Sequence, residues 1–202
     1  MVVQAPLSAA VGFVVAGGLS TRMGRDKALL PWRGATLLDH AIARLRAACG
    51  DVRILCGPAP RYADRGLPLV LDAVAGAGPL AGLAAGLESA GAAPGLYLAV
   101  DLPHVTVALL SALLAIDGGA DAVVPVTADG AEPLCAVYRA GCGPAVRARL
   151  AAGERRMTSF WPDVRVHALE GTALRAFGDP RRLFHNVNAP ADLDGVGGTG
   201  PA

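Results

Sequence analysis

The sequence predicts an α/β fold, with a doubly wound, mostly parallel sheet covered by helices on both faces, in a single domain. Three observations lead to this prediction. Short apolar runs alternate with longer segments of helical periodicity, as in a parallel sheet with crossover helices. The chain is 53% hydrophobic but only 4% aromatic, which indicates a core of closely packed Ala, Val and Leu. Its 202 residues suit one domain of this kind, and no stretch has the composition of a linker.

Nine segments carry the predicted secondary structure. Helical periodicity is clearest where Leu38, Ile42 and Leu45 share one face and Gly50 follows as a stop signal. Ligands of such sheets bind beyond the carboxyl ends of the strands, so we expect function to gather there. The strands are expected at 11–16, 52–56, 68–71, 96–100, 122–126 and 134–138, and the helices at 36–48, 79–90 and 106–116.

The densest glycine loop follows the first apolar run and ends at Lys27, the single lysine among 18 basic residues. Gly17 and Gly18 let backbone amides approach an anion closely, and Arg22, Arg25 and Lys27 concentrate positive charge. A lysine delivers a compact point charge, which suits phosphate. The loop is neither a Walker A sequence nor a dinucleotide fingerprint. A plain strand-to-helix turn with solvated arginines is the alternative, but the strand before the loop and the lysine at its end favour a phosphate site.

Two carboxylates follow predicted strands. Asp72 comes after the run at 68–71, and Asp101 comes after the run at 96–100. An acid at the tip of a buried strand is costly unless it is paired or binds a metal, so Asp101 is a candidate Mg²⁺ ligand. Its alternative role is to cap the turn before Pro103.

A Gly-Pro-Leu-Ala-Gly run at 78–82 places a proline at the first turn of a predicted helix. The small residues could let a planar base lie on this surface. Equally, they could allow close packing of the helix on the sheet.

The basic charge is uneven. Between Arg139 and Arg182 nine arginines face four acids, whereas the remaining chain has nine basic and thirteen acidic residues. This excess, which includes Arg155 and Arg156, indicates either a solvated basic face or a second anion site. Downstream, the side chains of Asn186 and Asn188 would share one face of an extended stretch.

Several functional classes are disfavoured. A net charge of +1 argues against a nucleic-acid binder. The four cysteines lie too far apart for a zinc or Cys-x-x-Cys site and suit a reduced, cytoplasmic protein. No apolar segment is long enough to span a bilayer and no export signal is evident, so we expect a soluble protein without a membrane partner.

Together these segments resemble the MobA-like nucleotidyltransferases, and most closely the molybdenum cofactor guanylyltransferases. The resemblance implies a Rossmann-like fold that transfers GMP from Mg-GTP to the terminal phosphate of molybdopterin and releases pyrophosphate. It also implies a molybdopterin-delivery protein or a molybdoenzyme chaperone as a possible partner. The matching segments, which cover nearly the whole chain in the family's order, are 15–27, 78–82, 101–103, 153–156 and 186–190.

The same resemblance implies a role for each matching residue. It divides the single domain, 1–202, into a nucleotide-binding half at about 10–105 and a pterin-binding half at about 106–194, with 195–202 expected to be a disordered tail. Cys56 stands where some members carry asparagine, and Ala189 replaces the usual threonine. The implied catalytic residues are Arg22, Lys27 and Asp101, with Asp101 on Mg²⁺; the nucleotide residues are Val15, Ala16, Gly17, Gly18, Lys27, Cys56, Asp72, Gly78, Pro79, Leu80 and Asp101; and the pterin residues are Arg155, Arg156, Asn186 and Asn188.

Two other functions remain open. One is a nucleotidyltransferase of the same fold that uses CTP or a different phosphorylated acceptor; Gly17, Gly18 and the run at 78–82 favour guanine over it. The other is a non-catalytic GTP-binding adaptor. Such a module could dispense with a metal carboxylate, so the presence of both Lys27 and Asp101 argues against it.

Overall fold

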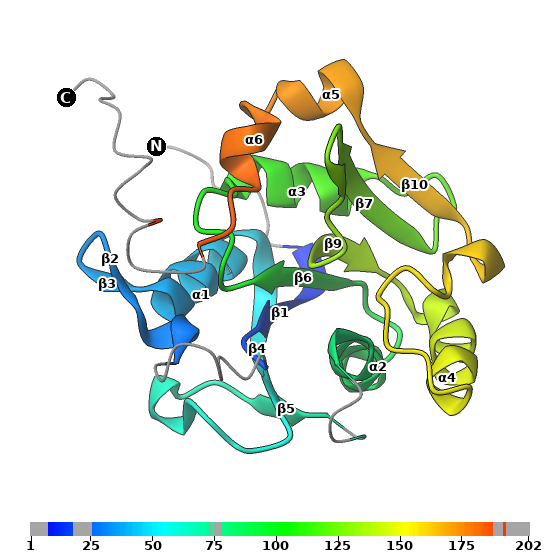
Figure 1. The fold of residues 1–202 in the computed structure, drawn as a ribbon, viewed down its shortest axis with the longest axis horizontal. Helices are drawn as coiled ribbons and strands as arrows, with labels where there is room; N and C mark the ends of the chain where they lie inside the picture. The colour runs from blue at the N-terminus through cyan, green and yellow to red at the C-terminus, as the bar shows by residue number, and fades with distance from the viewer. Residues whose placement is uncertain (1–7, 18–25, 73, 75–77, 188–191, 193–202) are drawn as a thin grey trace.

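The computed structural model describes residues 8–17, 26–72, 74, 78–187 and 192. A central sheet runs in the order β10-β7-β9-β6-β1-β4-β5, with β8 paired to β7, and a separate hairpin is formed by β2 and β3 (Figure 1). The strands are β1 Ser8–Val15, β2 Pro31–Trp32, β3 Ala35–Thr36, β4 Cys49–Gly57, β5 Leu69–Leu71, β6 Gly95–Ala99, β7 Ala122–Thr127, β8 Gly130–Ala131, β9 Cys135–Tyr138 and β10 Val166–Leu169.

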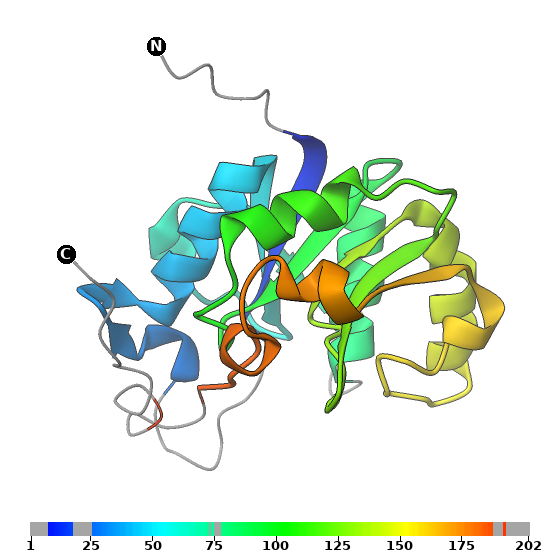
Figure 2. The ribbon, with the colours of Figure 1, turned by 90° about the horizontal axis from the view of Figure 1, so that it is seen from above.

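Helices cover both faces of this sheet, as predicted. Buried residues of α1, α3, α5 and α6 belong to one apolar cluster, and those of α2 and α4 belong to another. The two groups of helices lie on either side of the strands in Figures 1 and 2. The helices are α1 Leu37–Ala48, α2 Pro79–Ala90, α3 Val107–Ala115, α4 Gly143–Ala151, α5 Gly171–Arg175 and α6 Pro180–Leu183. None of these described helices has the length and apolar character needed to cross a membrane.

All but one of the main strands point the same way. β1 pairs in parallel with β4 and β6, β4 with β5, and β7 with β10. β9 is antiparallel to both of its neighbours, β6 and β7. The mostly parallel sheet is therefore confirmed, with one reversed strand in its interior, between β7 and β6.

The first predicted helix begins at a complete cap. The Thr36 hydroxyl accepts from the Asp39 amide, and the Asp39 carboxylate accepts from the Thr36 amide. This arrangement satisfies two donors that the helix start would otherwise leave without partners. The inward face of α1 is that predicted by its periodicity, with Leu38, Ile42 and Leu45 buried.

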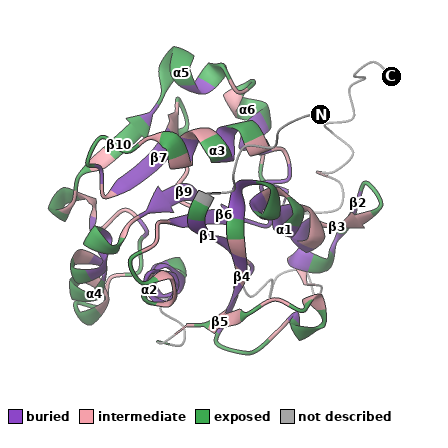
Figure 3. Ribbon diagram, turned by 180° about the vertical axis from the view of Figure 1, so that it is seen from behind, coloured by how far each residue is buried: buried purple, intermediate pink, exposed green. Residues whose placement is uncertain are grey.

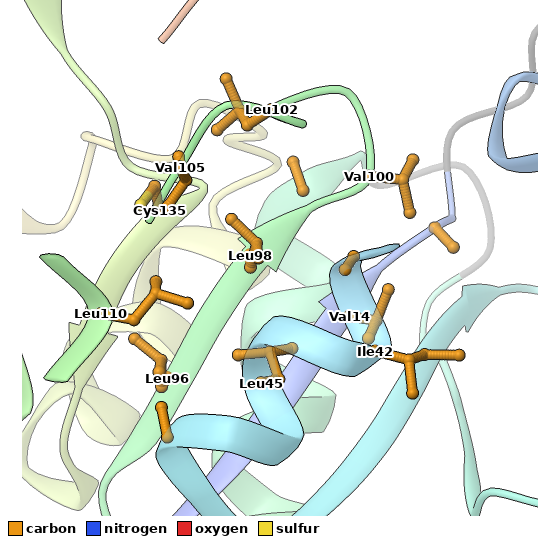
Figure 4. Close-up of a cluster of buried hydrophobic side chains, with 14 of the residues drawn as sticks. Val14, Ile42, Leu45, Leu96, Leu98, Val100, Leu102, Val105, Leu110 and Cys135 are labelled. Atoms are coloured by element: carbon orange, nitrogen blue, oxygen red, sulfur yellow. The ribbon is translucent and has the colours of Figure 1, made fainter. Parts of the chain in front are cut away.

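The core is built mainly of aliphatic side chains between helices and sheet. Figure 4 shows Ile42 and Leu45 of α1 packed toward Val14 of β1 and Leu96 of β6, with Leu110 of α3 alongside. On the other face, Phe13 stacks on Tyr97 with ring centroids 4.9 Å apart. Buried residues follow the central strands and exposed ones lie on the outer helices (Figure 3). The sheet is thus a rigid platform for whatever lies at its edge.

The β2–β3 hairpin closes through a tight turn at Arg33 and Gly34. Their φ angles are 45° and 83°, so both adopt the left-handed conformation favoured in two-residue hairpin turns. Trp32, the last residue of β2, is only 8% exposed. The hairpin lies beside α1 and brings Arg33 next to this buried ring.

Candidate functional site

A cavity of about 470 Å³ lies at the carboxyl ends of β1, β4 and β6. This is the edge at which ligands bind in sheets of this type. Leu55, Leu134 and Met157 contribute apolar surface to it. Many residues expected at the nucleotide line it, namely Val15, Ala16, Gly17, Lys27, Asp72, Gly78, Pro79 and Asp101.

Lys27 and Asp101 meet at one side of the cavity. Lys27 Nζ lies 2.9 Å from Asp101 Oδ2, and the two side chains are 17% and 27% exposed. Lys27 opens a short 3-10 turn, Lys27–Leu29, which is capped by the Asp26 carboxylate accepting from the Ala28 amide at 3.1 Å. This cap therefore fixes the lysine backbone just before the β2–β3 hairpin.

Two glycines let β1 and β4 end very close together. A Cβ on Gly17 would lie 3.0 Å from the Gly57 amide nitrogen and 3.2 Å from its Cα, and Gly57 has a φ of 78°. Neither backbone atom could move aside without displacing a strand. Gly17 is therefore required by this close approach.

Arg61 and Tyr62 brace the same corner, and sequence analysis missed both. Arg61 Nη2 donates to the Ala16 carbonyl at 2.9 Å and to the Cys56 carbonyl at 3.3 Å, while Nη1 lies 3.3 Å from Asp26 Oδ2. Tyr62 Oη donates to the same Asp26 oxygen at 2.6 Å. One guanidinium thus joins the ends of β1 and β4 to the cap of the Lys27 turn. These contacts span up to 45 positions in sequence, and no local motif signals them.

Asp72 lies at another part of the cavity. Its amide donates to the Gly57 carbonyl at 3.0 Å, which fixes it beside β4. Burial raises the pKa of its carboxyl. A Cβ on Gly82 of α2 would lie 3.4 Å from Asp72 Oδ1, so the carboxylate packs against the small-residue surface of that helix.

Glu132 supplies a second acidic group near Asp101, also missed from the sequence. Burial, followed by the charges of Asp101 and Asp129, raises its pKa to about 7. Its amide donates to the Pro125 carbonyl at 2.9 Å, and Leu134, two residues on, lines the cavity. The only sequence signal was an acid-proline pair just before the run at 134–138.

Two expected nucleotide residues have side chains that face the core. Cys56 and Leu80 are both 0% exposed, and the Cys56 thiol donates to the Val70 carbonyl at 3.5 Å. Neither residue lines the cavity, so nucleotide contact by these side chains is not supported. Strand alternation brings Leu55 to the cavity in place of Cys56.

The residues expected at the pterin are split between two places. Arg155 is exposed and lies against Gly78, where a Cβ would be 3.7 Å from Arg155 Cβ, and Arg156 is exposed beside it. Asn186 is exposed and precedes Val187, whose amide donates to the Asp101 carbonyl at 2.9 Å. Arg155 thus borders one end of the cavity and Asn186 adjoins Asp101.

Gly18, Arg22 and Asn188 lie outside the described residues.

The donor set at Asp101 suits a magnesium ion that is shared with a substrate. No group of three or more His, Cys, Asp or Glu within the described ranges is arranged to hold a metal by itself. Mg²⁺ usually takes one or two carboxylates and completes its shell with phosphate oxygens and water. The nearby charge of Glu132, whose pKa Asp101 helps to raise, marks this corner as favourable to a cation. Asp101 is the residue that would hold the ion.

Comparison with known proteins agrees with this geometry. Residues 12–166 match the family described as the MobA-like NTP transferase domain. The chain belongs to this family. As a MobA-like NTP transferase it is an enzyme, a nucleotidyltransferase. This finding argues against the alternative of a non-catalytic adaptor.

Relatives of this MobA-like NTP transferase match it over almost their whole length. A probable molybdenum cofactor guanylyltransferase of Deinococcus radiodurans is 39% identical over 199 residues, covering 96% of each chain. One from Pelotomaculum thermopropionicum is 36% identical over 184 residues, covering 91% of this chain and 90% of the relative.

Solved structures confirm the fold. The molybdopterin-guanine dinucleotide biosynthesis protein A of Archaeoglobus fulgidus superposes with a TM-score of 0.77 at 24% identity, covering 91% of this chain and 95% of that one. The 2-C-methyl-D-erythritol 4-phosphate cytidylyltransferase of Thermus thermophilus gives 0.65 at 18% identity, covering 90% and 94%. The shared fold therefore serves more than one base, and base selectivity has to be argued from the site.

Proposed function

We propose that the chain is a molybdenum cofactor guanylyltransferase, which transfers GMP from Mg-GTP to the terminal phosphate of molybdopterin and releases pyrophosphate. The observation that carries the proposal is the Lys27–Asp101 pair beside a cavity that also contains Asp72. Relatives at 36–40% identity named as probable guanylyltransferases support the same substrate pair.

The reaction requires positioning and charge neutralisation rather than a covalent enzyme intermediate. An oxygen of the acceptor phosphate attacks the α-phosphorus of GTP, and the bond from that phosphorus to its bridging oxygen breaks. The electron pair of this bond leaves with pyrophosphate. Lys27 offsets charge on the phosphates, and Asp101 would hold Mg²⁺, which supplies further neutralisation when it is bound.

Guanine recognition is assigned to Asp72 and the surface of α2 beside it. The carboxylate can accept from the N1–H and exocyclic amine of guanine, a pair of donors that neither adenine nor cytosine presents in the same way. Asp72, Gly78, Pro79 and Gly82 line the same cavity, so a base that contacts the Asp72 carboxylate would lie beside the start of α2.

The acceptor is assigned to the other half of the chain, with Arg155, Arg156, Asn186 and Asn188 as its predicted contacts. Arginine forks suit anionic groups, and amide side chains offer donors and acceptors that match a pterin edge. A molybdopterin-delivery protein or a molybdoenzyme chaperone would be the partner at this end. We place this chemistry in the cytoplasm, which the four buried free thiols support.

The proposal is tested by mixing purified protein with Mg²⁺, molybdopterin and each nucleoside triphosphate in turn, and measuring pyrophosphate. We expect release with GTP alone, and none after EDTA is added. Release with CTP but not GTP would contradict the guanine assignment. Tight GTP binding with no pyrophosphate from any acceptor would contradict the guanylyltransferase function.

A further inference from the structure

A group of basic side chains surrounds Trp32 outside the nucleotide cavity. We call it the cationic cluster and define it as Arg33, Arg44, His104, Arg182 and His185. Its members come from the β2–β3 turn, α1, the segment after β6, α6 and the segment after α6. None of them lines the nucleotide cavity.

The ring of Trp32 organises the cluster. The Arg33 guanidinium carbon lies 4.7 Å from the ring centroid, and that of Arg44 lies 5.7 Å from it. The His104 ring makes an edge contact with the indole at 5.4 Å, and its centroid is 6.4 Å from that of His185. Arginines over an indole face are held in place while their outward donors remain available.

The arginines of the cluster differ from most other described arginines in their pairing. Arg53, Arg61, Arg65, Arg149 and Arg165 each form a salt bridge, whereas no described acid between Asp26 and Asp179 forms one with Arg33, Arg44 or Arg182.

The pKa of His104 reflects the basic groups around it. Burial lowers its pKa first, and the nearby basic groups of Arg182, Arg33, His185 and Arg44 lower it further. The pKa of Arg44 is lowered by burial and then by Arg33. Repulsion between these basic groups destabilises the protein when no anion is bound. A bound anion would offset that repulsion.

Hydrogen bonds to two backbone carbonyls link the segments of the cluster to the segment around Asp101. Arg44 donates to the Pro103 carbonyl, and Val187 donates to the Asp101 carbonyl at 2.9 Å. His104 directly follows Pro103, and His185 lies two residues before Val187. Both histidines are therefore close in sequence to residues that contact Arg44 or Asp101, and Asp101 marks the proposed reaction point. Arg155, by contrast, lies at Gly78, where α2 begins.

Resting on the proposed function, we propose that the cationic cluster binds the terminal phosphate of the acceptor, a phosphomonoester, while Arg155, Arg156, Asn186 and Asn188 remain the predicted contacts of its pterin part. The acceptor phosphate has to approach the α-phosphorus to about 3–3.5 Å, against the repulsion of a triphosphate. Lys27 lines the cavity and offsets the charge of the triphosphate. The arginines of the cluster supply permanent cations outside the cavity, next to the segments that contact the Pro103 and Asp101 carbonyls.

The test uses Arg33→Asn, Arg182→Gln and their double variant, because both residues are exposed and asparagine tolerates the left-handed turn position. Arg46→Gln is the matched control, since Arg46 is an exposed arginine of α1 outside the cluster. Arg155→Gln is measured alongside. Initial rates are recorded with molybdopterin varied at saturating Mg-GTP, and with Mg-GTP varied at saturating molybdopterin.

We expect the double variant to raise the KM for molybdopterin by about tenfold or more, as the loss of charge-assisted hydrogen bonds implies. The KM for GTP and kcat should stay within about twofold, and Arg46→Gln should match the wild type. An unchanged KM for molybdopterin would overturn the proposal while leaving the guanylyltransferase function intact. A raised value in Arg155→Gln alone would assign the acceptor charge to the other end of the cavity and overturn it too.

Two further measurements separate the remaining outcomes. Product inhibition by pyrophosphate tests whether the cluster serves the leaving group instead; a weaker inhibition with an unchanged KM for molybdopterin would overturn the proposal. If the wild type shows no turnover, the proposed function fails. Molybdopterin binding is then measured by fluorescence on protein saturated with a non-hydrolysable GTP analogue. Binding that is lost in the double variant would support the cluster, and no binding or equal binding would overturn it.

Discussion

At the scale of single residues, the 2.9 Å contact between Lys27 and Asp101 places the two opposite charges that phosphoryl transfer needs at one point of the cavity. Both side chains are partly exposed, so their attraction contributes little to folding. In the proposed reaction they stabilise the transition state, where fixed charges act without the cost of rearranging solvent. Activity and stability should therefore respond differently to their removal.

Lys27→Ala and Asp101→Ala are each expected to lower kcat by on the order of a hundredfold or more, about 3 kcal/mol of transition-state stabilisation. The free energy of unfolding should change by less than about 1 kcal/mol. Pyrophosphate release and urea unfolding measure the two effects. Arg46→Ala and Asp117→Ala, at exposed positions away from the cavity, are the controls. Near-normal activity of Asp101→Ala at saturating Mg²⁺ would show that the metal is held elsewhere.

Glu132 predicts a pH dependence of stability. Its pKa rises from the ordinary glutamate value of 4.5 to about 7 in the folded protein, because it is partly buried and close to Asp101 and Asp129. A carboxyl with a raised folded-state pKa binds its proton more tightly when folded. It therefore imposes no penalty below about pH 4.5 and destabilises the fold increasingly as pH rises toward 7.

Glu132→Gln should remove that penalty. In EDTA, its urea midpoint should exceed that of the wild type at pH 8, and the difference should shrink toward pH 4.5. Asp129→Asn, which changes only a minor contributor, is the control. A difference that is constant with pH would show that Glu132 does not titrate in this range.

At the scale of elements, the site depends on how the ends of β1 and β4 are held. Arg61 bridges the carbonyls of Ala16 and Cys56 and reaches the Asp26 carboxylate. Because Asp26 caps the turn that carries Lys27, this one guanidinium couples two strand ends to the lysine that we propose to act on the phosphates.

Arg61→Gln is expected to raise the KM for GTP by about tenfold and to lower the free energy of unfolding by roughly 1–3 kcal/mol, since several charge-assisted hydrogen bonds are lost. Arg61→Lys should rescue little, because a single ammonium cannot span the three acceptors. Arg65→Gln, in the same segment but paired with Asp39 and Asp64, should lower stability and leave the KM for GTP unchanged. Equal effects of the two glutamine variants on the KM would contradict a positioning role for Arg61.

The sequence predicted these elements unevenly. All six expected strands and all three expected helices are present, because apolar runs and helical faces are local signals. β10 was missed because it is an edge strand whose His167 and Ala168 are exposed, which leaves no apolar run. α4 was missed because it begins with Gly143 and Pro144 and has a weak apolar face. The reversal of β9 is set by its neighbours and has no local signal.

The same division between local and long-range signals holds for the candidate site. The loop residues at strand ends, such as Gly17, Asp72 and Asp101, could be located because topology brings strand ends together. Arg61 and Glu132 could not, since only the folded chain carries them to the cavity. Cys56 was assigned by family position, yet its side chain faces the core.

At the scale of the whole molecule, the two halves of the chain share one sheet. β9 belongs to the second half, but it lies between β6 of the first half and β7 of the second. Because β9 pairs with a strand of each half, neither half can lose its strands without exposing strand edges of the other half. The domain at 1–202 is therefore expected to unfold in one step.

The two tryptophans report this directly, since Trp32 lies in the first half and Trp161 in the second. Trp32→Phe and Trp161→Phe each leave one reporter, and Trp161 Nε1 is buried without a hydrogen-bond partner in the described structure, so its replacement leaves no acceptor unpaired. Within each variant, tryptophan fluorescence and far-UV circular dichroism should give coincident urea midpoints. Separate midpoints would show that the halves unfold independently.

The reversed direction of β9 also changes what the edge of the sheet can receive. A purely parallel sheet would present only segments that leave its strands at this edge, and each such segment must travel on to a crossover helix. β9 runs the other way, so the chain that enters it, with Glu132 and Leu134, arrives at the same edge as Asp101. The Leu134 carbonyl accepts from the Ala99 amide at 2.8 Å, which ties the arriving segment to the departing one. Between β7 and β9 lies a short hairpin through β8 that bears no crossover helix. Reversal of this single strand therefore brings a further acid, Glu132, close to Asp101 without a further crossover helix.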